Sequence, residues 1–578
     1  MLLMVCAFLP ATAHAATVSQ PVQFEASDGA LLHADVAGEG DLHARPLIVE
    51  FTPYGPACCG TSFGPEYNSV QVHVRGTGLS TGTWTAVGPR DQQDVSEFLA
   101  WACHQPWSNG HIGLWGFSAS AIAIYNSLHL PLPCVDSASL MAGTADLYRD
   151  LLNPGGIPNL GPGAVVATGV GAPLIANGLS ALLGGRSPLP ALQSGLGFMG
   201  TILQILAHTT EDQFWLDHTQ RPGPNTFPIL ADTSFYDPEA RGPFESFKLL
   251  RATNPGSHLL VFGAHDGFPA TTPGPFPQYK RWFDHYLLGV DNGINHDPVV
   301  QLLVGNGSRE ALLSGNLTHV DASDWPVPGT RWQRLYLDPA RSGTALSLND
   351  GSLRGARPAA RTAQAYPAVS SLATATDPHT TSTLAGVGAA PLSFGTLFSL
   401  VPSLTQMNLA EPISLSYTTA PFRAPVNVVG PGSLDVFVAT ALPESDLHAV
   451  IADVWPDGRA FAVGVVRLRT SFPDIDLSRS VIDSHGEVVQ PYGVYSAKRP
   501  AVPLQTREYH VEFWPIGNRF QTGHRLRVYL VGTSAYMLPA LPGLNVVSIG
   551  GATPSRLLLP VLPGSDACAA IGAAPGCS

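Results

Sequence analysis

Charged residues are scarce in this sequence, and lysine is the scarcest of them. Charged side chains make up 13% of the 578 residues, and lysine occurs only at Lys248, Lys280 and Lys498. The formal net charge is −13. A chain with this balance lacks the basic surface that attracts phosphate backbones and anionic headgroups. We therefore expect neither nucleic acid nor an anionic membrane surface as its main partner.

The spacings that mark a metal site in a linear sequence are also missing. No Cys-x-x-Cys pair and no histidine-rich cluster occurs along the chain. Structural zinc sites usually show such a spacing of cysteine and histidine ligands. We therefore expect no metal and no cofactor.

Long apolar runs are missing beyond the N-terminus, which excludes a membrane-spanning helix of about 20 residues. The first 15 residues are themselves apolar and end in Ala-Thr-Ala-His-Ala, a small-x-small cleavage pattern. This pattern predicts a secretory signal peptide over residues 1–15 and an extracellular protein after its removal. The run lacks a positively charged start, which would fit a start upstream of Met1, and a buried N-terminal helix is the alternative.

Cysteine is infrequent but even in number once the leader is removed. Six cysteines remain: Cys58, Cys59, Cys103, Cys134, Cys568 and Cys577. An even number in an exported chain indicates disulfides, although sequence alone does not fix the pairing. Cys568 and Cys577 are close enough to hold the C-terminal tail, and Cys103 with Cys134 would brace the segment around Ser118.

The length of the chain predicts two to four domains. From residue 21 to about residue 150, apolar strands alternate with helical segments, including a strand at 46–51, an amphipathic helix at 91–102 and a strand at 112–115. Such alternation is typical of an α/β fold with a mostly parallel sheet covered on both faces.

The α/β pattern is interrupted and then resumes. Residues 147–226 form an insertion in which Gly, Ala, Leu and Pro dominate, with almost no charge. We interpret it as a helical cap over the carboxyl edge of the sheet, with a buried pair of core helices as the alternative. Strands at 227–230 and 258–262 and a helix at 278–288 then complete a domain that spans residues 16–297.

Beyond Pro298 helical patterns largely vanish. Short alternating strands separated by Gly, Pro, Asn and Asp continue to the end, as at 434–438 and 525–530. This pattern predicts an all-β jelly roll, a β-sandwich, over residues 298–578. The stretch 352–383 is rich in Ala, Arg, Thr and Pro and is interpreted as a loop or linker.

Ser118 is the candidate catalytic nucleophile. It lies between a buried strand and an Ala- and Ile-rich segment that could continue as a helix. A serine forced onto a tight strand-to-helix turn, with small neighbours at Gly116, Ala119 and Ser120, is typical of the nucleophile elbow of α/β-hydrolases. The motif is imperfect, since Ser120 stands where the usual Gly-x-Ser-x-Gly has glycine.

A serine hydroxyl needs a base held in place by an acid, and on this fold both follow the serine along the chain. Asp237 follows the strand at 227–230, and His265 follows the strand at 258–262. Both loops would open at the edge of the sheet where the elbow lies. We predict Asp237 as the acid and His265 as the base. The alternatives are Asp232 and Asp266 for the acid, and His285, His111 and His208 for the base.

The oxyanion of the tetrahedral intermediate needs two preorganised donors. The backbone N–H of Ala119, directly after the nucleophile, is one by geometry. Tyr54, fixed between proline and glycine after the strand at 46–51, is the candidate for the second. An aromatic residue at such a position can equally serve packing.

Several stretches taken together resemble the CocE/NonD hydrolases, the family that contains cocaine esterase and is related to X-Pro dipeptidyl-peptidases and α-amino-acid ester hydrolases. The similar stretches are residues 52–55, 75–82, 105–113, 235–237, 281–289, 453–460 and 523–526. By this resemblance Tyr54 is the oxyanion tyrosine, Ser118 the nucleophile, Asp237 the acid and His265 the base. The chain departs from the family at Ala119 and Ala121, in its short histidine loop and in its vicinal Cys58-Cys59 pair. Because of these departures, the resemblance does not fix the substrate preference of this chain.

The leading hypothesis is a secreted serine hydrolase that cleaves acyl esters, or amides, through an acyl-enzyme intermediate. The alternative enzyme is an X-Pro dipeptidyl-peptidase, which needs a carboxylate for the substrate α-ammonium. Glu239 is the only nearby acid, and a solvated loop glutamate is the simpler interpretation of it. The alternative outside enzymes is a glycan-binding surface protein with a vestigial elbow.

Overall fold

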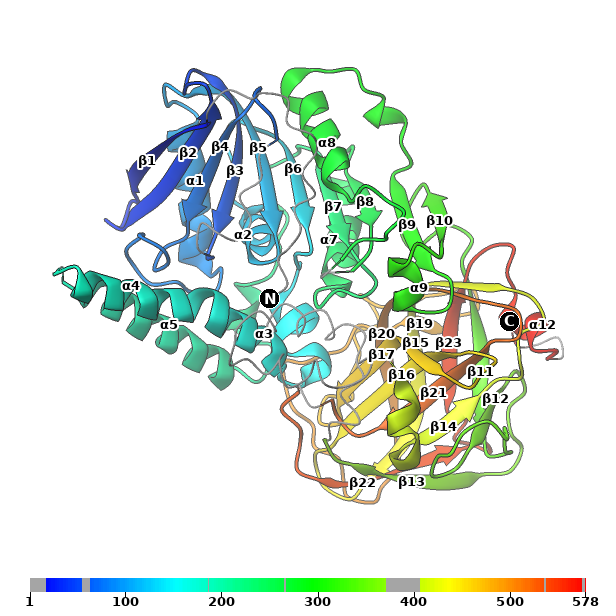
Figure 1. Cartoon of the computed structure of the whole chain (residues 1–578). Coiled ribbons are helices and arrows are strands. Elements are labelled where there is room, and N and C mark those ends of the chain that lie inside the picture. The colour runs from blue at the N-terminus through cyan, green and yellow to red at the C-terminus, as the bar shows by residue number, and fades with distance from the viewer. Residues whose placement is uncertain are drawn as a thin grey trace.

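The computed structural model describes residues 17–54, 63–185, 187–264, 267–370, 406–534, 537–573 and 577 (Figure 1). The predicted leader at 1–15, the vicinal cysteines Cys58 and Cys59, and the pair His265 and Asp266 lie outside the described residues.

The N-terminal half is built on one sheet whose central strands are parallel. Its spatial order is β1-β2-β4-β3-β5-β6-β7-β8-β9-β10, with antiparallel pairing only at the ends, where β1 joins β2, β2 joins β4, and β9 joins β10. The strands are β1 (Thr17–Glu25), β2 (Leu31–Glu39), β3 (Arg45–Thr52), β4 (Asn68–His73), β5 (Ser108–Phe117), β6 (Val135–Met141), β7 (Ile229–Thr233), β8 (His258–Val261), β9 (Val300–Gly305) and β10 (Leu317–Ala322). The sheet therefore continues past residue 298 before the chain enters the second half.

Helices cover both faces of this sheet, as the alternating pattern predicts. The helices of the domain are α1 (Pro89–Ala102), α2 (Ala119–Ser127), α7 (Arg241–Thr253), α8 (Phe276–Leu288) and α9 (Arg309–Leu313), with a 3-10 turn at Ile294–His296. The buried faces of α1 and α2 pack together with β3 and β5. On the opposite face α8 approaches so closely that a Cβ on Gly113 of β5 would lie 2.7 Å from the Phe283 ring. These two layers hold the ends of the parallel strands in fixed positions.

The segment between β6 and β7 is helical. It contains α3 (Leu160–Val166), α4 (Ala172–Leu183), α5 (Leu189–Ala207) and α6 (Gln213–Leu216), with π-helical turns at Tyr148–Leu152 and Ala167–Gly171 and a 3-10 turn at Pro154–Gly156. Helices α4 and α5 form a hairpin that extends away from the body of the protein in Figure 1. Its base rests on the loop after β4, where the Thr201 hydroxyl donates to the Trp84 carbonyl at 2.6 Å. Helices thus occupy the segment expected as an insertion, and its role as a cap stays a prediction.

The C-terminal half is a β domain. Its main strands are β11 (Arg331–Asp338), β12 (Gly351–Arg354), β13 (Thr362–Ala368), β14 (Leu415–Thr418), β15 (Val426–Thr440), β16 (Asp446–Val454), β17 (Ala460–Arg469), β20 (Arg507–Phe520), β21 (Arg525–Val531), β22 (Gly543–Ile549) and β23 (Arg556–Val561). Its smaller elements are β18 (Val481–Ile482), β19 (Val488–Gln490), a 3-10 helix at Met407–Ile413 and α12 (Ala567–Ala570). Pairing runs β11-β12-β14-β21-β16-β17-β20-β15-β23 and returns to β11, which encloses an apolar core.

One expectation for this half is wrong. The stretch 352–383 was expected to be a loop or linker because of its composition, but the structure places β12 and β13 in its first part. Strand β13 pairs with β22 over seven registered positions, from Thr362 with Ile549 to Ala368 with Gly543. Backbone pairing with a distant strand overrides the weak local propensity of this segment.

Charged groups join the two halves. The Arg241 guanidinium at the start of α7 donates to Glu512 of β20 at 3.1 Å and to Asp150 at 2.7 Å. Arg149 donates to the Gly493 carbonyl at 2.7 Å. Because all of these partners are buried or half-buried, the β domain is fixed against the α/β half rather than tethered to it. None of the helices in the described residues is long and apolar enough to cross a membrane.

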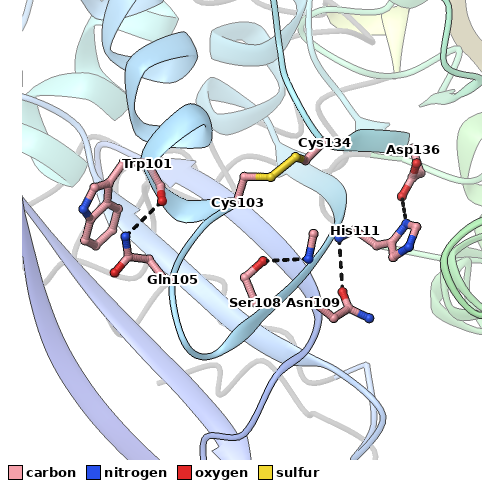
Figure 2. The surroundings of a disulfide bond; sticks show 9 residues. Trp101, Cys103, Gln105, Ser108, Asn109, His111, Cys134 and Asp136 are labelled. Atoms are coloured by element: carbon pink, nitrogen blue, oxygen red, sulfur yellow. Dashed lines mark hydrogen bonds and ion pairs between the residues drawn. A yellow bond between two sulfur atoms is a disulfide. The ribbon is translucent and has the colours of Figure 1, made fainter.

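Two disulfides are formed among the described residues, and both pairings suggested by the sequence are confirmed. Cys103, directly after α1, joins Cys134, directly before β6, with Cα atoms 6.1 Å apart (Figure 2). Cys568 joins Cys577 and holds the C-terminal tail. The first bridge ties the helix before β5 to the strand after α2, so it encloses the segment that carries Ser118.

Removing the Cys103–Cys134 bridge by a double substitution to serine is expected to lower the free energy of unfolding by about 3–4 kcal/mol, since the bridge closes a long loop. The sequence separation is 31 residues, against 9 for Cys568–Cys577. Replacing the second pair should therefore cost about 2–3 kcal/mol. Urea unfolding of both double variants measures which bridge contributes more to the free energy of unfolding. A larger loss of that free energy on removal of the C-terminal bridge would contradict the loop-length argument.

Candidate active site

Ser118 occupies the sharp turn between β5 and α2. Its backbone has φ 53° and ψ −121°, a conformation that residues other than glycine rarely adopt. The turn is held on both sides: the Ser118 N–H donates to the Met141 carbonyl and the Ser118 carbonyl accepts from the Ile122 N–H, each at 3.0 Å. Strain of this kind persists only where the surrounding structure enforces it, and it is typical of a nucleophile elbow.

Two neighbours show why the sequence tolerates this turn. A Cβ on Gly116 would lie 2.5 Å from the Ala121 nitrogen, so only glycine fits there. Ser120, where the usual motif has glycine, donates its buried hydroxyl to the buried Glu50 carboxylate of β3 at 3.0 Å. Gln71 of β4 also donates to Glu50, at 3.4 Å. The departure at Ser120 thus has a specific partner beneath the elbow, and sequence reasoning missed Glu50 although it interrupts an apolar strand.

The predicted oxyanion donors lie at the same edge of the sheet. Strands β3 and β5 are parallel neighbours, so the loop after β3, which carries Tyr54, opens where Ser118 lies. The half-buried Tyr54 ring packs beneath the inserted helices, since a Cβ on Gly169 would lie 3.0 Å from it. Ala119 is the first residue of α2, a position whose backbone N–H has no partner within the helix.

Asp237 follows β7 and is buried, with 2% of its surface exposed. Its Oδ1 accepts a hydrogen bond from the Glu239 backbone N–H at 3.0 Å. Strand β7 ends at Thr233 rather than at the predicted position 230, which brings the end of the strand closer to this acid. A side-chain carboxyl fixed in this way can orient an imidazole.

The backbone on either side of the predicted base lies against the Asp237 loop. Ala264 forms a parallel bridge with Tyr236, the residue directly before Asp237, and an antiparallel bridge with Gly267. The Ser234 hydroxyl also donates to the Gly263 carbonyl. His265 itself lies outside the described residues, so its role stays a prediction, but the flanking residues connect its loop to the acid.

Comparison with known proteins identifies the family to which the chain is similar. The family described as X-Pro dipeptidyl-peptidase (S15 family) matches residues 28–266, and the X-Pro dipeptidyl-peptidase C-terminal non-catalytic domain matches residues 292–546. A cocaine esterase from Rhodococcus sp. (strain MB1 Bresler) is 26% identical over 424 residues, which cover 66% of this chain and 69% of that protein. The chain is a CocE/NonD-like hydrolase related to the X-Pro dipeptidyl-peptidases.

Solved structures share the whole fold at low identity. A CocE/NonD family hydrolase from Staphylococcus aureus superimposes with a TM-score of 0.71 at 19% identity, covering 94% of each chain. An α-amino acid ester hydrolase superimposes with a TM-score of 0.70 at 16% identity, covering 97% of this chain and 100% of the other. The fold is therefore that of an α/β-hydrolase followed by a C-terminal β domain.

Glu239 differs from what the sequence suggested. It was expected to be a solvated loop glutamate, but only 4% of its surface is exposed. Burial, and then the neighbouring negative charge of Asp237 and a hydrogen bond with it, raises the pKa of Glu239 well above its ordinary value. In this CocE/NonD-like hydrolase the shift favours the neutral form of the Glu239 carboxyl beside Asp237.

The raised pKa of Glu239 has a measurable consequence for stability. A carboxyl whose folded pKa lies above its unfolded value, here 4.5, binds a proton more tightly in the folded state. Its contribution to the free energy of unfolding is complete below the unfolded pKa. That contribution is lost as pH rises toward the folded pKa, by about 1.4 kcal/mol per pH unit. We expect Glu239→Gln to remove this loss. The free energy of unfolding in urea, measured from about pH 5 to about pH 8, should therefore change less with pH in the variant than in wild type. The same pH dependence of the free energy of unfolding in both proteins would contradict this expectation.

The alternative acid Asp232 does not fit the role. It is buried in β7 and accepts a hydrogen bond from the Tyr279 hydroxyl of α8. Burial raises its pKa well above the ordinary value, although that hydrogen bond opposes the shift. A carboxyl that is held by α8 and favours its neutral form cannot stabilise an imidazolium.

The alternative bases among the described residues have other partners. His285 on α8 contacts the Val290 carbonyl at 2.9 Å and the Asn295 amide at 3.1 Å, as expected for a structural role. His111 pairs with Asp136 at 2.8 Å near the start of β5 (Figure 2), seven residues and roughly 23 Å of strand from Ser118. His208 pairs with Asp212 at 2.6 Å at the end of α5. Each ring is thus already occupied by a partner of its own.

Proposed function

We propose that the protein is a serine hydrolase that cleaves carboxylic esters through an acyl-enzyme intermediate. His265 would take the proton of the Ser118 hydroxyl as its oxygen attacks the ester carbonyl, while Asp237 holds the imidazole. The imidazolium then gives that proton to the leaving alcohol, and an acyl-serine forms. Water, activated by His265, releases the carboxylic acid and restores the serine. The strained elbow at Ser118, at the sheet edge shared with the Asp237 loop, is the observation that carries this proposal.

The oxyanion of both tetrahedral intermediates would be held by the Ala119 N–H and the Tyr54 hydroxyl. Tyr54→Phe is expected to lower kcat on the best ester by about 10²–10³, since a fixed donor is lost where charge develops. The ring packing against Gly169 should keep the phenylalanine in place. An undiminished kcat would remove Tyr54 from the mechanism.

The substrate class follows from the inserted helices, for which a capping role remains a prediction. Residues 160–207 contain a single charged residue, Arg186. Apolar side chains are exposed on both helices of the hairpin, among them Ile175, Leu183 and Leu196 at 76%, 80% and 66%. A surface of this composition favours lipophilic acyl or aryl groups over charged ones.

The second candidate is an X-Pro dipeptidyl-peptidase, which the S15 match favours. An exopeptidase of this type must bind an α-ammonium, and Glu239 favours its neutral form, which weakens it as that anchor. Parallel assays of p-nitrophenyl esters of varied acyl length and of Ala-Pro-p-nitroanilide decide between the two. Turnover of the anilide in excess of every ester would overturn the ester assignment.

We also propose that the protein is secreted and that its C-terminal β domain is a jelly roll. Support comes from the apolar leader in the sequence and from two disulfides, which persist in oxidising compartments. Fractionation of cells that produce the full chain tests this: the mature protein is expected in the medium, without residues 1–15. Retention of the intact N-terminus inside the cell would contradict it.

A further inference from the structure

Strands β2 and β4 bring two histidines and an aspartate together at the antiparallel end of the sheet. The strands pair with Ala34 opposite Val72 and Asp35 opposite Gln71. Because side chains alternate along a strand, His33 and Asp35 project from the same face of β2. Continuing the register places His73, the last residue of β4, opposite His33. Three metal-binding side chains therefore share one face across two strands.

The distances within this cluster suit a shared metal ion better than direct hydrogen bonds. The Asp35 carboxylate oxygens lie 3.6 Å from His33 Nε2 and 3.6 Å from His73 Nε2, beyond normal hydrogen-bond length. One ligand atom from each residue lies within 4.8 Å of the others. Bonds of 2.0–2.1 Å in a tetrahedral zinc site place ligand atoms about 3.3 Å apart. The three ligand atoms would therefore need to move only slightly closer together to bind one ion.

The histidine side of the cluster is well anchored. His33 and His73 are 9% and 3% exposed, and their rings lie 5.5 Å apart. The Ser80 hydroxyl joins their backbones, since it accepts from the His33 N–H at 2.9 Å and donates to the His73 carbonyl at 2.6 Å. The Asp35 side chain is 37% exposed, so solvent can reach the cluster from its side.

The chemistry of the three side chains also suits a cation. A neutral imidazole offers the lone pair that a metal requires. Two imidazole nitrogens and one carboxylate favour zinc and related transition metals over magnesium or calcium, which prefer oxygen ligands alone.

We propose that His33, Asp35 and His73 bind one Zn²⁺ ion, with the fourth position open to water. The ion would join β2 to β4 and so stabilise the end of the sheet that supports β3 and the elbow. None of the three ligands is a residue assigned to the hydrolytic reaction, so the proposal is independent of the hydrolase assignment. No linear motif predicts it, since the ligands are contributed by two strands that are separate in sequence.

Equilibrium dialysis of the full-length protein tests the site. The protein is treated with EDTA, desalted and dialysed against ZnCl₂, and bound zinc is measured by atomic emission. Wild type is expected to hold one equivalent more than Asp35→Asn and His33→Gln. His111→Gln is the matched control, since it removes a histidine paired with an aspartate that forms no three-ligand group within the part of the chain that the structure describes, and it should bind as wild type does. The difference between variants is decisive because other residues of the chain can also take up metal.

A second measurement separates binding from misfolding. Thermal unfolding in EDTA should give similar midpoints for all four proteins if the variants fold, and added zinc should raise the midpoint of wild type and His111→Gln alone. Cobalt should produce ligand-field absorption of tetrahedral type in the same two proteins. Equal zinc content in wild type and the two ligand variants, or an unchanged midpoint of wild type with zinc, would overturn the proposal.

Discussion

Ser118→Ala is expected to lower kcat on p-nitrophenyl esters by on the order of 10⁵–10⁶, the loss typical of a missing nucleophile in a serine hydrolase. The elbow is held by the backbone contacts of Ser118 with Met141 and Ile122, which alanine retains. Alanine also tolerates the backbone conformation about as well as serine does, so the loss should come from chemistry and not from unfolding. Circular dichroism and thermal unfolding check that the fold persists.

Labelling with a fluorophosphonate probe gives the same experiment a direct readout. Wild type should form one covalent adduct, and Ser118→Ala should form none. Ser120→Ala is the matched control, because it removes a neighbouring hydroxyl that is directed to Glu50 and should keep the label. An unlabelled wild type would favour the glycan-binding alternative with a vestigial elbow, and a labelled Ser118→Ala would move the nucleophile elsewhere.

Asp237→Asn is expected to lower kcat by about 10⁴, since an amide at this position favours the wrong imidazole tautomer and offers no charge to the imidazolium. The comparison that makes this result specific is Glu239→Gln. Both carboxyls are buried and close together, but burial and the charge of Asp237 raise the pKa of Glu239, and glutamine mimics the neutral form that this shift favours. The loss in Glu239→Gln should therefore be far smaller.

The pair of variants distinguishes a catalytic acid from a structural one. Measured over a range of pH, Asp237→Asn should lower kcat throughout the neutral range, while Glu239→Gln should leave the shape of the profile unchanged. Equal losses in both variants would mean that the two carboxyls act as one unit, and a larger loss in Glu239→Gln would exchange their assignments.

Much of the fold could be predicted because local patterns agree with the tertiary arrangement. The strand at 46–51 and the helix at 91–102 are observed as β3 and α1 with small changes at their ends. The stretch 352–383 failed because its composition carries no local signal, and β13 exists only through pairing with β22. For the same reason the burial of Glu239 could not be predicted, since a loop glutamate is usually solvated unless distant elements cover it.

The sequence by itself determined where the elbow lies and which half of the chain is α/β, because each of these depends on residues close together or on a repeating local pattern. The tertiary structure alone decided that burial raises the pKa of Glu239, why Ser120 can replace glycine, and that His33, Asp35 and His73 meet. These features depend on strands that hydrogen-bond across long separations in sequence and on how completely other elements exclude water. Register and burial are properties of the packed fold, and no short stretch of sequence contains them.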